Sequence, residues 1–504
     1  MICMLMALPA SAQLFRVQCP TSTAEHPLVT PTAANPKGAN PAIKCQEVSG
    51  ADGYATMADG AQIYLFGFGP LSGLELIKAG LPGTQTSAAF NNAYNVPYLQ
   101  GLDAANGNAS VPDPLYEAAK AVAPNGAIAD SAEIMKIGVL SAQQPAPLMA
   151  IDEDDEFFLT LSNVGMIMRP DLFEQHTIHF HGYPNASPFF DGVPDASVAV
   201  NISGSMTYYY QAPDAGTYFW HCHITPPEHL QMGMVGQLYV RPRQNRVQPG
   251  ADLLGPLIAA NQKAPGAVDG KSCSDILCTG QTPAPAAGAV REAAPVMYAY
   301  NDGDGSTAYD VEYPIQMMGF DPTFHFAGMT FEPEDFSGMK DKYFMLSGRS
   351  YPDTVGGNVD AGGNVVPGPI RTQASDGLAR PSQPLPTRII LESCVGQPGA
   401  CGTRKHRALL RMSDVNVTEF TTLATIGIPM KVIAVNARLL RDLAGNNLSY
   451  LTNSVTMGGG ESTDVILDAA TVPPGTYFLY STNLDHLSND AENFGGMMTE
   501  IIVN

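Results

Sequence analysis

The stretch that decides the fold lies between His176 and Met234. It opens with HTIHFHGYPN (176–185) and closes with GTYFWHCHITPPEHLQMGM (216–234). Six of the ten histidines of the chain fall within it, and its one cysteine, Cys222, has a histidine on either side. A lone histidine in a β-sheet is usually an ordinary polar residue, but HxxHxH and HCH in one stretch indicate a metal site.

The spacing of these residues assigns them to the faces of two strands. Side chains two residues apart point to the same face of a β-strand. We therefore expect His179 and His181 to share one face, and His221 and His223 to share one face of a second strand. Cys222 then points to the opposite face from its two neighbours.

A thiolate and two imidazoles, with a thioether at longer range, form the ligand set of a type 1 (blue) copper site. His176, Cys222, His229 and Met234 supply this set. Met232 is a competing axial ligand, and the spacing from His229 favours Met234. The sequence thus predicts copper on one side of the strand and imidazoles for a second copper site on the other, joined by the covalent path through the cysteine.

These motifs resemble the multicopper oxidases, the laccase-like branch of the cupredoxin superfamily. The resemblance is carried by HTIHFHG (176–182), DGVP (191–194), AGTYFWHCH (215–223) and HLQMGM (229–234). It implies the type 1 ligands named above, and a trinuclear, oxygen-reducing cluster to which this chain contributes the other four histidines: His179, His181, His221 and His223. The gap from Cys222 to His229 is longer than usual by two residues, so we expect an altered loop around the copper with every ligand kept.

Composition sets the class of protein. At 504 residues the chain is long enough for two or three domains with full cores. A formal charge of −22 argues against nucleic acid as a partner and favours an acidic, soluble surface. No apolar run reaches the length of a membrane span.

Cysteine usage points to an oxidising compartment. Six cysteines fall into close pairs, which predict three local disulfides: Cys19–Cys45, Cys273–Cys278 and Cys394–Cys401. Residues 1–12 end in a small-residue A-x-A pattern like that of a secretory signal, although no basic residue precedes Arg16. We expect a periplasmic or extracellular protein.

The order of apolar and turn-rich segments predicts an all-β protein. We expect two cupredoxin-like Greek-key β-sandwich domains with an N-terminal extension and a helical insertion. The expected parts are a signal segment (1–12), an extended N-terminal arm (13–60), a copper-binding domain with the insertion (61–242), a linker (243–290) and a degenerate cupredoxin domain (291–504). Short helices are predicted at 71–80 and 113–124 within the insertion.

An internal repeat identifies the second domain. PGTYFLYST (474–482) matches AGTYFWHCH (215–223) position by position. Tyr480, Ser481 and Thr482 then stand where the first domain has His, Cys and His. We therefore expect a second cupredoxin domain that cannot bind type 1 copper, and we interpret His486 near it as a surface residue.

The repeat limits the number of copper ligands that this chain can supply. In the family, a trinuclear cluster uses eight histidines, four from each of two domains. This chain offers four, plus at most His325, His406 and His486 from the second domain. We therefore expect missing ligands to come from another subunit, as a homo-oligomer or a partner chain.

Three functions fit. The first is a multicopper oxidase-like oxidoreductase that takes electrons from a small molecule or a redox protein, with oxygen as acceptor. The second resembles copper nitrite reductases, with His181, His221 and a neighbour's His486 on one copper; a histidine at position 179 departs from that pattern. The third is a non-enzymatic type 1 copper electron carrier.

Overall fold

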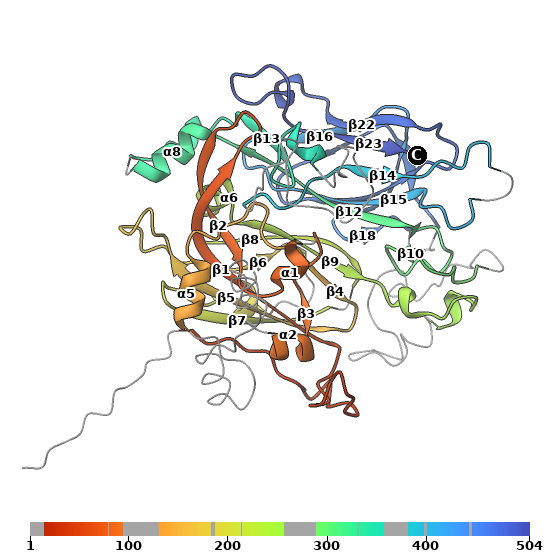
Figure 1. The fold of residues 1–504 in the computed structure, drawn as a ribbon, viewed down its shortest axis with the longest axis horizontal. Helices are drawn as coiled ribbons and strands as arrows, with labels where there is room; N and C mark the ends of the chain where they lie inside the picture. The colour runs from red at the N-terminus through yellow and green to blue at the C-terminus, as the bar shows by residue number, and fades with distance from the viewer. Residues whose placement is uncertain are drawn as a thin grey trace, which may run out of the picture.

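The computed structural model describes residues 15–78, 80–93, 131–182, 187–212, 214–256, 289–330, 332–356, 382–397, 401–442 and 446–504. Two β-sandwiches follow one another along the chain. In Figure 1 the first, red to yellow-green, lies below the second, green to blue. The predicted all-β fold of two sandwich domains is confirmed. Segment 1–12, the predicted helix at 113–124 and the Cys273–Cys278 pair lie outside the described residues.

The first sandwich consists of two sheets. One has the order β2 (Gln62–Pro70), β1 (Ile43–Thr56), β5 (Glu156–Gly165) and β7 (Ser205–Gln211), with β3 (Gln85–Thr86) paired to β1. The other has the order β4 (Met149–Asp152), β9 (Val235–Arg241), β8 (Gly216–His221) and β6 (His179–Phe180). Among the described residues, the helices of this half are α1 (Leu74–Lys78), α2 (Ser87–Ala93), α5 (Ser131–Gly138) and α6 (Pro226–Met232).

The second sandwich repeats this plan. Its larger sheet has the order β13 (Tyr343–Leu346), β12 (Val311–Phe320), β15 (Arg407–Asp414), β21 (Ser462–Asp468), β17 (Met430–Val435) and β18 (Arg438–Leu439), with β19 (Tyr450–Thr452) paired to β17. Its smaller sheet has the order β14 (Ile389–Leu391), β23 (Met498–Val503), β22 (Gly475–Ser481), β16 (Thr421–Thr425) and β20 (Ser454–Met457). The remaining elements are the pair β10 (Met297–Tyr298) and β11 (Ala308–Tyr309), α8 (Pro322–Thr330), and short 3₁₀ turns at 188–190, 243–246, 336–338, 353–355 and 484–487.

Strand order and direction show the duplication. The order β2-β1-β5-β7 of the first domain corresponds to β13-β12-β15-β21 of the second, and β4-β9-β8-β6 corresponds to β14-β23-β22-β16. The parallel pairs also correspond, because β1 with β5 and β4 with β9 match β12 with β15 and β14 with β23. The internal repeat read from the sequence therefore extends to the whole domain.

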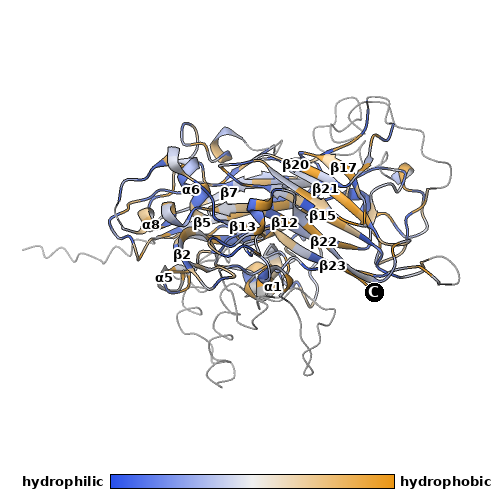
Figure 2. Cartoon of the chain, turned by 90° about the horizontal axis from the view of Figure 1, so that it is seen from above, coloured by the Kyte–Doolittle hydropathy of each residue, from blue (hydrophilic) through white to orange (hydrophobic). Residues whose placement is uncertain are grey.

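Each sandwich has its own apolar core. In β7, the inward-facing side chains are Met206, Tyr208 and Tyr210, which alternate with outward-facing residues. In the second domain, apolar colour runs along β15, β17 and β21 (Figure 2). A third cluster, which includes Phe219 and Phe320, joins the two domains.

The prediction of an extended N-terminal arm over residues 13–60 is wrong for the second half of that range. Residues Ile43–Thr56 form β1, which pairs with both β2 and β5 inside the first sheet. The strand is buried along most of its length although it carries polar residues such as Glu47 and Asp52. A strand buried on both faces shows no alternation of apolar and polar residues, so alternation in the sequence does not indicate this strand.

The two described disulfides are Cys19–Cys45 and Cys394–Cys401, as predicted. The first ties the segment before β1 to that strand. None of the helices among the described residues has both the length and the apolar composition needed to cross a bilayer.

Candidate metal centre

Cys222 directly follows β8 and is fully buried. Donor atoms of His176, Cys222 and His229 all lie within 4.8 Å of one another; we call these three residues the thiolate cluster. The backbone N–H of Thr177 donates to Cys222 Sγ at 3.3 Å. The backbone N–H of Cys222 donates to the carbonyl of Met234 at 3.1 Å, which ties the cysteine to the start of β9.

The loop before β6 places His176. Its backbone forms a bridge with Val200, and the Asn163 side chain donates to the carbonyls of Val200 and Glu174, each at 2.8 Å. The His176 ring lies against Gly50 of β1, where a Cβ atom would stand 2.5 Å from the ring. A glycine is thus required there for close approach.

His229 lies on α6, which begins with two prolines at the N-terminal turn where proline is tolerated. Its Nδ1 lies 3.2 Å from Cys222 Sγ, and its Nε2 faces Glu174 at 3.5 Å. Met234 follows the helix, is buried, and donates its N–H to the His229 carbonyl at 2.8 Å. Met232 lies against Gly328 of α8 instead. A Cβ built on Gly328 would stand 3.5 Å from Met232 Sδ.

The electrostatics of the thiolate cluster favour a cation. Burial raises the pKa of Cys222, but the charge of His229 and contact with His176 outweigh it and hold the pKa well below its usual value. Burial lowers the pKa of His229, whereas the thiolate raises it more, to about 10. Both ring nitrogens of His176 are buried and have no hydrogen-bond partner. A buried thiolate beside unpartnered imidazole nitrogens is a donor set that fits copper.

The second cluster is assigned to the other side of the strand, because successive side chains of a strand alternate between its faces. Donor atoms of His179, His181 and His221 lie within 4.8 Å of one another, and His179 pairs with His221 across β6 and β8. His223 is half-buried, and its ring centre lies 5.0 Å from that of His179, but it is outside this group of converging donors. The structure thus brings together three of the four predicted histidines and keeps the fourth beside them. We call all four the histidine cluster.

Carbonyl groups orient the rings. His179 Nδ1 donates to the carbonyl of Asp191 at 2.7 Å, and His221 Nδ1 donates to the carbonyl of Cys222 at 2.6 Å, which leaves both Nε2 atoms as acceptors. Gly192 of the DGVP motif has φ of +80°, and a Cβ there would collide with the Ile178 carbonyl at 2.1 Å. The motif therefore serves to bring Asp191 against β6.

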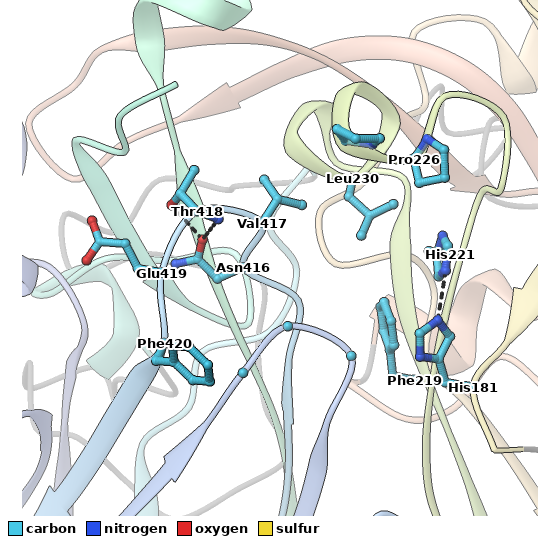
Figure 3. Close-up of a pocket in the computed structure, with 14 residues that line it drawn as sticks. His181, Phe219, His221, Pro226, Leu230, Asn416, Val417, Thr418, Glu419 and Phe420 are labelled. Carbon is cyan, nitrogen blue, oxygen red and sulfur yellow. Dashed lines mark hydrogen bonds between the residues drawn. The ribbon is translucent and has the colours of Figure 1, made fainter. Parts of the chain in front are cut away.

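The Nε2 atoms of His181 and His221 lie 3.0 Å apart (Figure 3). Burial lowers the pKa of His181 to about 4 and that of His221 to about 3. Between two neutral rings this contact is a hydrogen bond from the Nε2–H of His181 to the lone pair of His221 Nε2, and a metal ion can replace that proton. This convergence also fits a metal ion.

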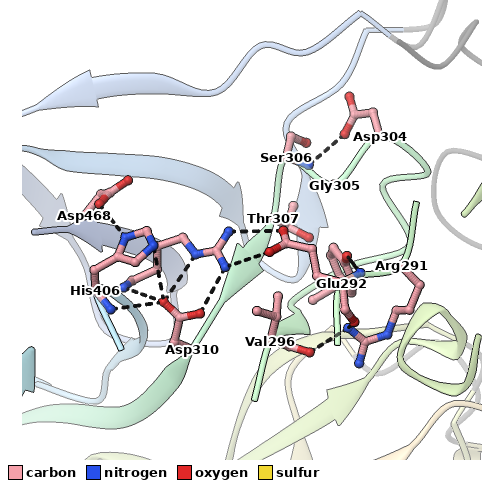
Figure 4. Close-up of polar contacts among 12 residues, drawn as sticks. Arg291, Glu292, Val296, Asp304, Gly305, Ser306, Thr307, Asp310, His406 and Asp468 are labelled. Carbon is pink, nitrogen blue, oxygen red and sulfur yellow. Dashed lines mark hydrogen bonds and ion pairs between the residues drawn. The ribbon is translucent and has the colours of Figure 1, made fainter. Parts of the chain in front are cut away.

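Histidines elsewhere in the chain are engaged. His26 bonds to Glu156 at 2.7 Å, and His406 bonds to Asp468 at 2.9 Å with Asp310 alongside (Figure 4). His325 is buried in α8, where its Nδ1 contacts the Tyr64 carbonyl and its Nε2 lies 3.0 Å from the Gln231 carbonyl. None of these three faces the histidine cluster.

His486 is fully buried, so its interpretation as a surface residue is wrong. Its Nδ1 lies 3.2 Å from Ser481 Oγ and its Nε2 lies 2.9 Å from Glu419, which mirrors His229 between Cys222 and Glu174. Met497 donates its N–H to the His486 carbonyl at 2.8 Å, as Met234 does to His229. The strand pairing β16–β22 places Thr421 where the first domain has His176. The second domain has thus kept the frame of the thiolate cluster without the cysteine and one histidine.

Gly50 and Glu174 are the site residues that the sequence did not indicate. Gly50 lies far from the histidine motifs along the chain, and Glu174 falls in a loop without a recognisable pattern. Gly50 could have been suspected only from the three-dimensional pairing of β1 with β5. Glu174 stands two residues before His176, as Glu419 stands two before Thr421, and this shared spacing was a signal in the repeat.

Comparison with known proteins finds relatives of the first domain. A family model described as multicopper oxidase matches residues 127–244. A laccase of Aspergillus fumigatus is 32% identical over 112 residues, which are 22% of this chain and 18% of that protein. A multicopper oxidase of Talaromyces pinophilus is 30% identical over 112 residues, which are 22% of this chain and 17% of that protein. The matched segment thus spans less than a fifth of these relatives.

Among solved structures, a blue copper oxidase from Nitrosomonas europaea is similar with a TM-score of 0.49 and 16% identity, over 91% of this chain and 85% of that chain. The segment matched by the family model contains both histidine motifs, the thiolate cluster and the histidine cluster. Residues 127–244 of this chain are therefore similar to the multicopper oxidase family, whose members use copper.

Proposed function

We propose that this protein is a copper-dependent oxidoreductase of the oxidase type, with type 1 copper at His176, Cys222, His229 and Met234 and a second copper site at His179, His181, His221 and His223. The observation that carries the proposal is the placement of the two clusters on opposite sides of one strand, with Cys222 directly after His221. Copper at these ligands would supply one-electron redox chemistry.

Different residues of the site serve the entry of electrons and their transfer to the second site. His229 turns its Nδ1 to the thiolate and its Nε2 outward to Glu174, which is 25% exposed at its side chain. The electron donor, a small molecule or a redox protein, docks at this edge. The route to the second site runs along the backbone of Cys222, whose carbonyl accepts the hydrogen bond of His221 Nδ1.

Oxygen as the acceptor follows from the family of the domain and from the retention of four further histidines. The chain itself does not supply eight ligands, because its four outer histidines are held elsewhere. Further ligands for a larger cluster would come from a partner subunit. A nitrite reductase-type site that borrows His486 from a neighbour is disfavoured, because that residue is buried in its own domain.

Copper analysis with absorption and EPR spectroscopy tests the proposal. We expect Cys222→Ser to remove the visible thiolate-to-copper band and oxygen consumption. His181→Gln with His221→Gln should keep the band, remove the type 2 EPR signal and stop oxygen consumption. A visible band that persists in Cys222→Ser, or one copper per chain with no oxygen consumption in the unaltered protein, would overturn it.

The disulfides at Cys19–Cys45 and Cys394–Cys401 support an exported protein, because such bonds persist in oxidising compartments. We propose a periplasmic or extracellular location. Fractionation of the source cells tests it, with the protein expected outside the cytoplasm.

A further inference from the structure

A cleft of about 460 Å³ lies between the two domains, directly beside the histidine cluster. One wall comes from the first domain, with His181, His221 and Phe219, whose ring centre lies 4.6 Å from that of His181. The opposite wall comes from residues 416–420 of the second domain (Figure 3). A space of this size suits a small molecule.

The lining of the cleft selects the chemistry of its occupant. Besides the two histidines, most of the described lining side chains are apolar: Phe219, Pro226, Pro227, Leu230, Val417 and Phe420. The polar remainder is Asn416, Thr418 and Glu419, and no lining residue is a lysine or an arginine. Such a lining disfavours an anion and favours an uncharged, apolar ligand.

Three consecutive glycines, Gly458–Gly460, line part of the cleft and add no side chain to it. A Cβ at Gly459 would lie 2.2 Å from the Asn416 carbonyl, so the loop cannot carry a side chain there. A Cβ at Gly458 would lie 2.8 Å from the Phe420 ring, and a Cβ at Gly460 would lie 3.1 Å from His181 and 3.8 Å from Phe219. A planar molecule can therefore lie on the glycines with rings at both ends.

Phe420 is left 75% exposed at the mouth of this space. Exposure of a large aromatic side chain costs free energy that a ligand recovers when it covers the ring. We propose that the cleft is a binding site for a small, uncharged aromatic molecule, held between Phe420 and Phe219 with one edge against His181 and His221. This site is separate from the His229 edge, where the electron donor docks.

The consequence for activity rests on the proposed function. If copper occupies the histidine cluster, the bound molecule covers its open side and limits access of other reactants to it. Binding itself depends on the walls of the cleft and not on copper. The two proposals can therefore fail separately.

Calorimetric titration of the full-length protein with indole, a planar uncharged probe, tests the binding site. We expect one indole per chain, with about three- to tenfold weaker binding in Phe420→Ala, the range of one ring contact. Val417→Phe, which fills the cleft, should abolish binding. Phe494→Ala is the matched control, because that ring is 65% exposed and lies outside the cleft.

Absence of indole binding to the unaltered protein, or equal binding in Phe420→Ala and Phe494→Ala, would overturn the site. Thermal unfolding of each variant shows whether it is folded, and Phe420→Leu replaces Val417→Phe if the larger side chain prevents folding. The visible copper band is recorded on the same samples. Its absence with indole binding intact would defeat the proposed function and leave the binding site standing.

Discussion

The ring of His176 depends on the absence of a side chain at Gly50, where a Cβ would lie 2.5 Å from it. We expect Gly50→Ala to turn His176 away from Cys222 and to weaken Cu(II) binding about 10- to 100-fold, the usual effect of losing support for a ligand. Titration followed by the visible absorption band measures this. Gly53→Ala on the same strand is the control, because the new Cβ would meet Ala142, at 3.3 Å, and not His176. Equal affinity in the two variants would contradict this placement of the ring.

A second residue-scale prediction concerns Glu47, which is buried with only the hydroxyl of Ser162 donating to its carboxyl group. Burial raises the pKa of Glu47 to about 8. Its folded state therefore keeps the proton between pH 4.5 and 8, whereas the unfolded chain loses it, so stability falls as pH rises through this window. At about 1.4 kcal/mol per pKa unit, the loss amounts to a few kcal/mol.

Glu47→Gln removes this titration. We expect the melting temperature of the variant to exceed that of the unaltered protein at pH 8.5. At pH 5 the difference between the two melting temperatures should be smaller, as measured by calorimetry. Glu25→Gln is the control, since Glu25 is exposed. The same difference in melting temperature at both pH values would show that the carboxyl group is not protonated in the folded state.

At this scale the sequence indicated which histidines and which cysteine would lie together, because their spacing is local. It could not predict what the ligands pack against. Gly50 acquires its role only when β1 pairs beside β5, and Glu174 acquires its role when α6 turns His229 Nε2 toward it.

At the scale of elements, β22 and the turn after it retain nearly all of the frame that holds the thiolate cluster at β8. His486, Glu419 and Met497 stand where the first domain has His229, Glu174 and Met234. Phe344 stacks on His486 at 4.2 Å, as Phe66 meets His229 edge-on at 5.1 Å. Two ligands are absent, at Thr421 and Ser481.

We therefore expect Thr421→His with Ser481→Cys, in a Cys222→Ser background, to create a thiolate-to-copper absorption band in the second domain. The frame already holds one imidazole beside position 481, at 3.2 Å. Ser481→Cys alone is the control and should give a much weaker band, because one imidazole is missing. A double variant that folds and binds Cu(II) without the band would contradict the correspondence between the domains.

Strands with plain apolar patterns were predictable from the sequence. The segment MKVIAVNARLL (430–440) contains β17 and β18, and STDVILDA (462–469) contains β21. β1 was not predictable, because buried Glu47, Ser49 and Asp52 interrupt its pattern. α6 was not predicted either, because Pro226 and Pro227 suggest a loop until their place in the first helical turn is known.

At the scale of the whole molecule, the two domains share a buried polar contact. Thr217 of β8 donates to Asp464 of β21 at 2.6 Å, and Tyr300 donates to the same carboxylate at 2.5 Å. Loss of one partner of a buried carboxylate costs roughly 1–3 kcal/mol. Because the contact joins strands of both sandwiches, we expect its loss to destabilise both domains together and not one domain alone.

We expect the unaltered protein to unfold in a single calorimetric transition, and Thr217→Val to lower the melting temperature of that transition as a whole. The physical reason is that unfolding of either domain would leave Asp464 or its partner unpaired. Thr422→Val is the control, because its hydroxyl bonds to Thr456 at an exposed position, at 2.9 Å, and there water can replace the partner. Two separate transitions in the unaltered protein, or equal melting temperatures in the two variants, would show that the domains are stable independently of this contact.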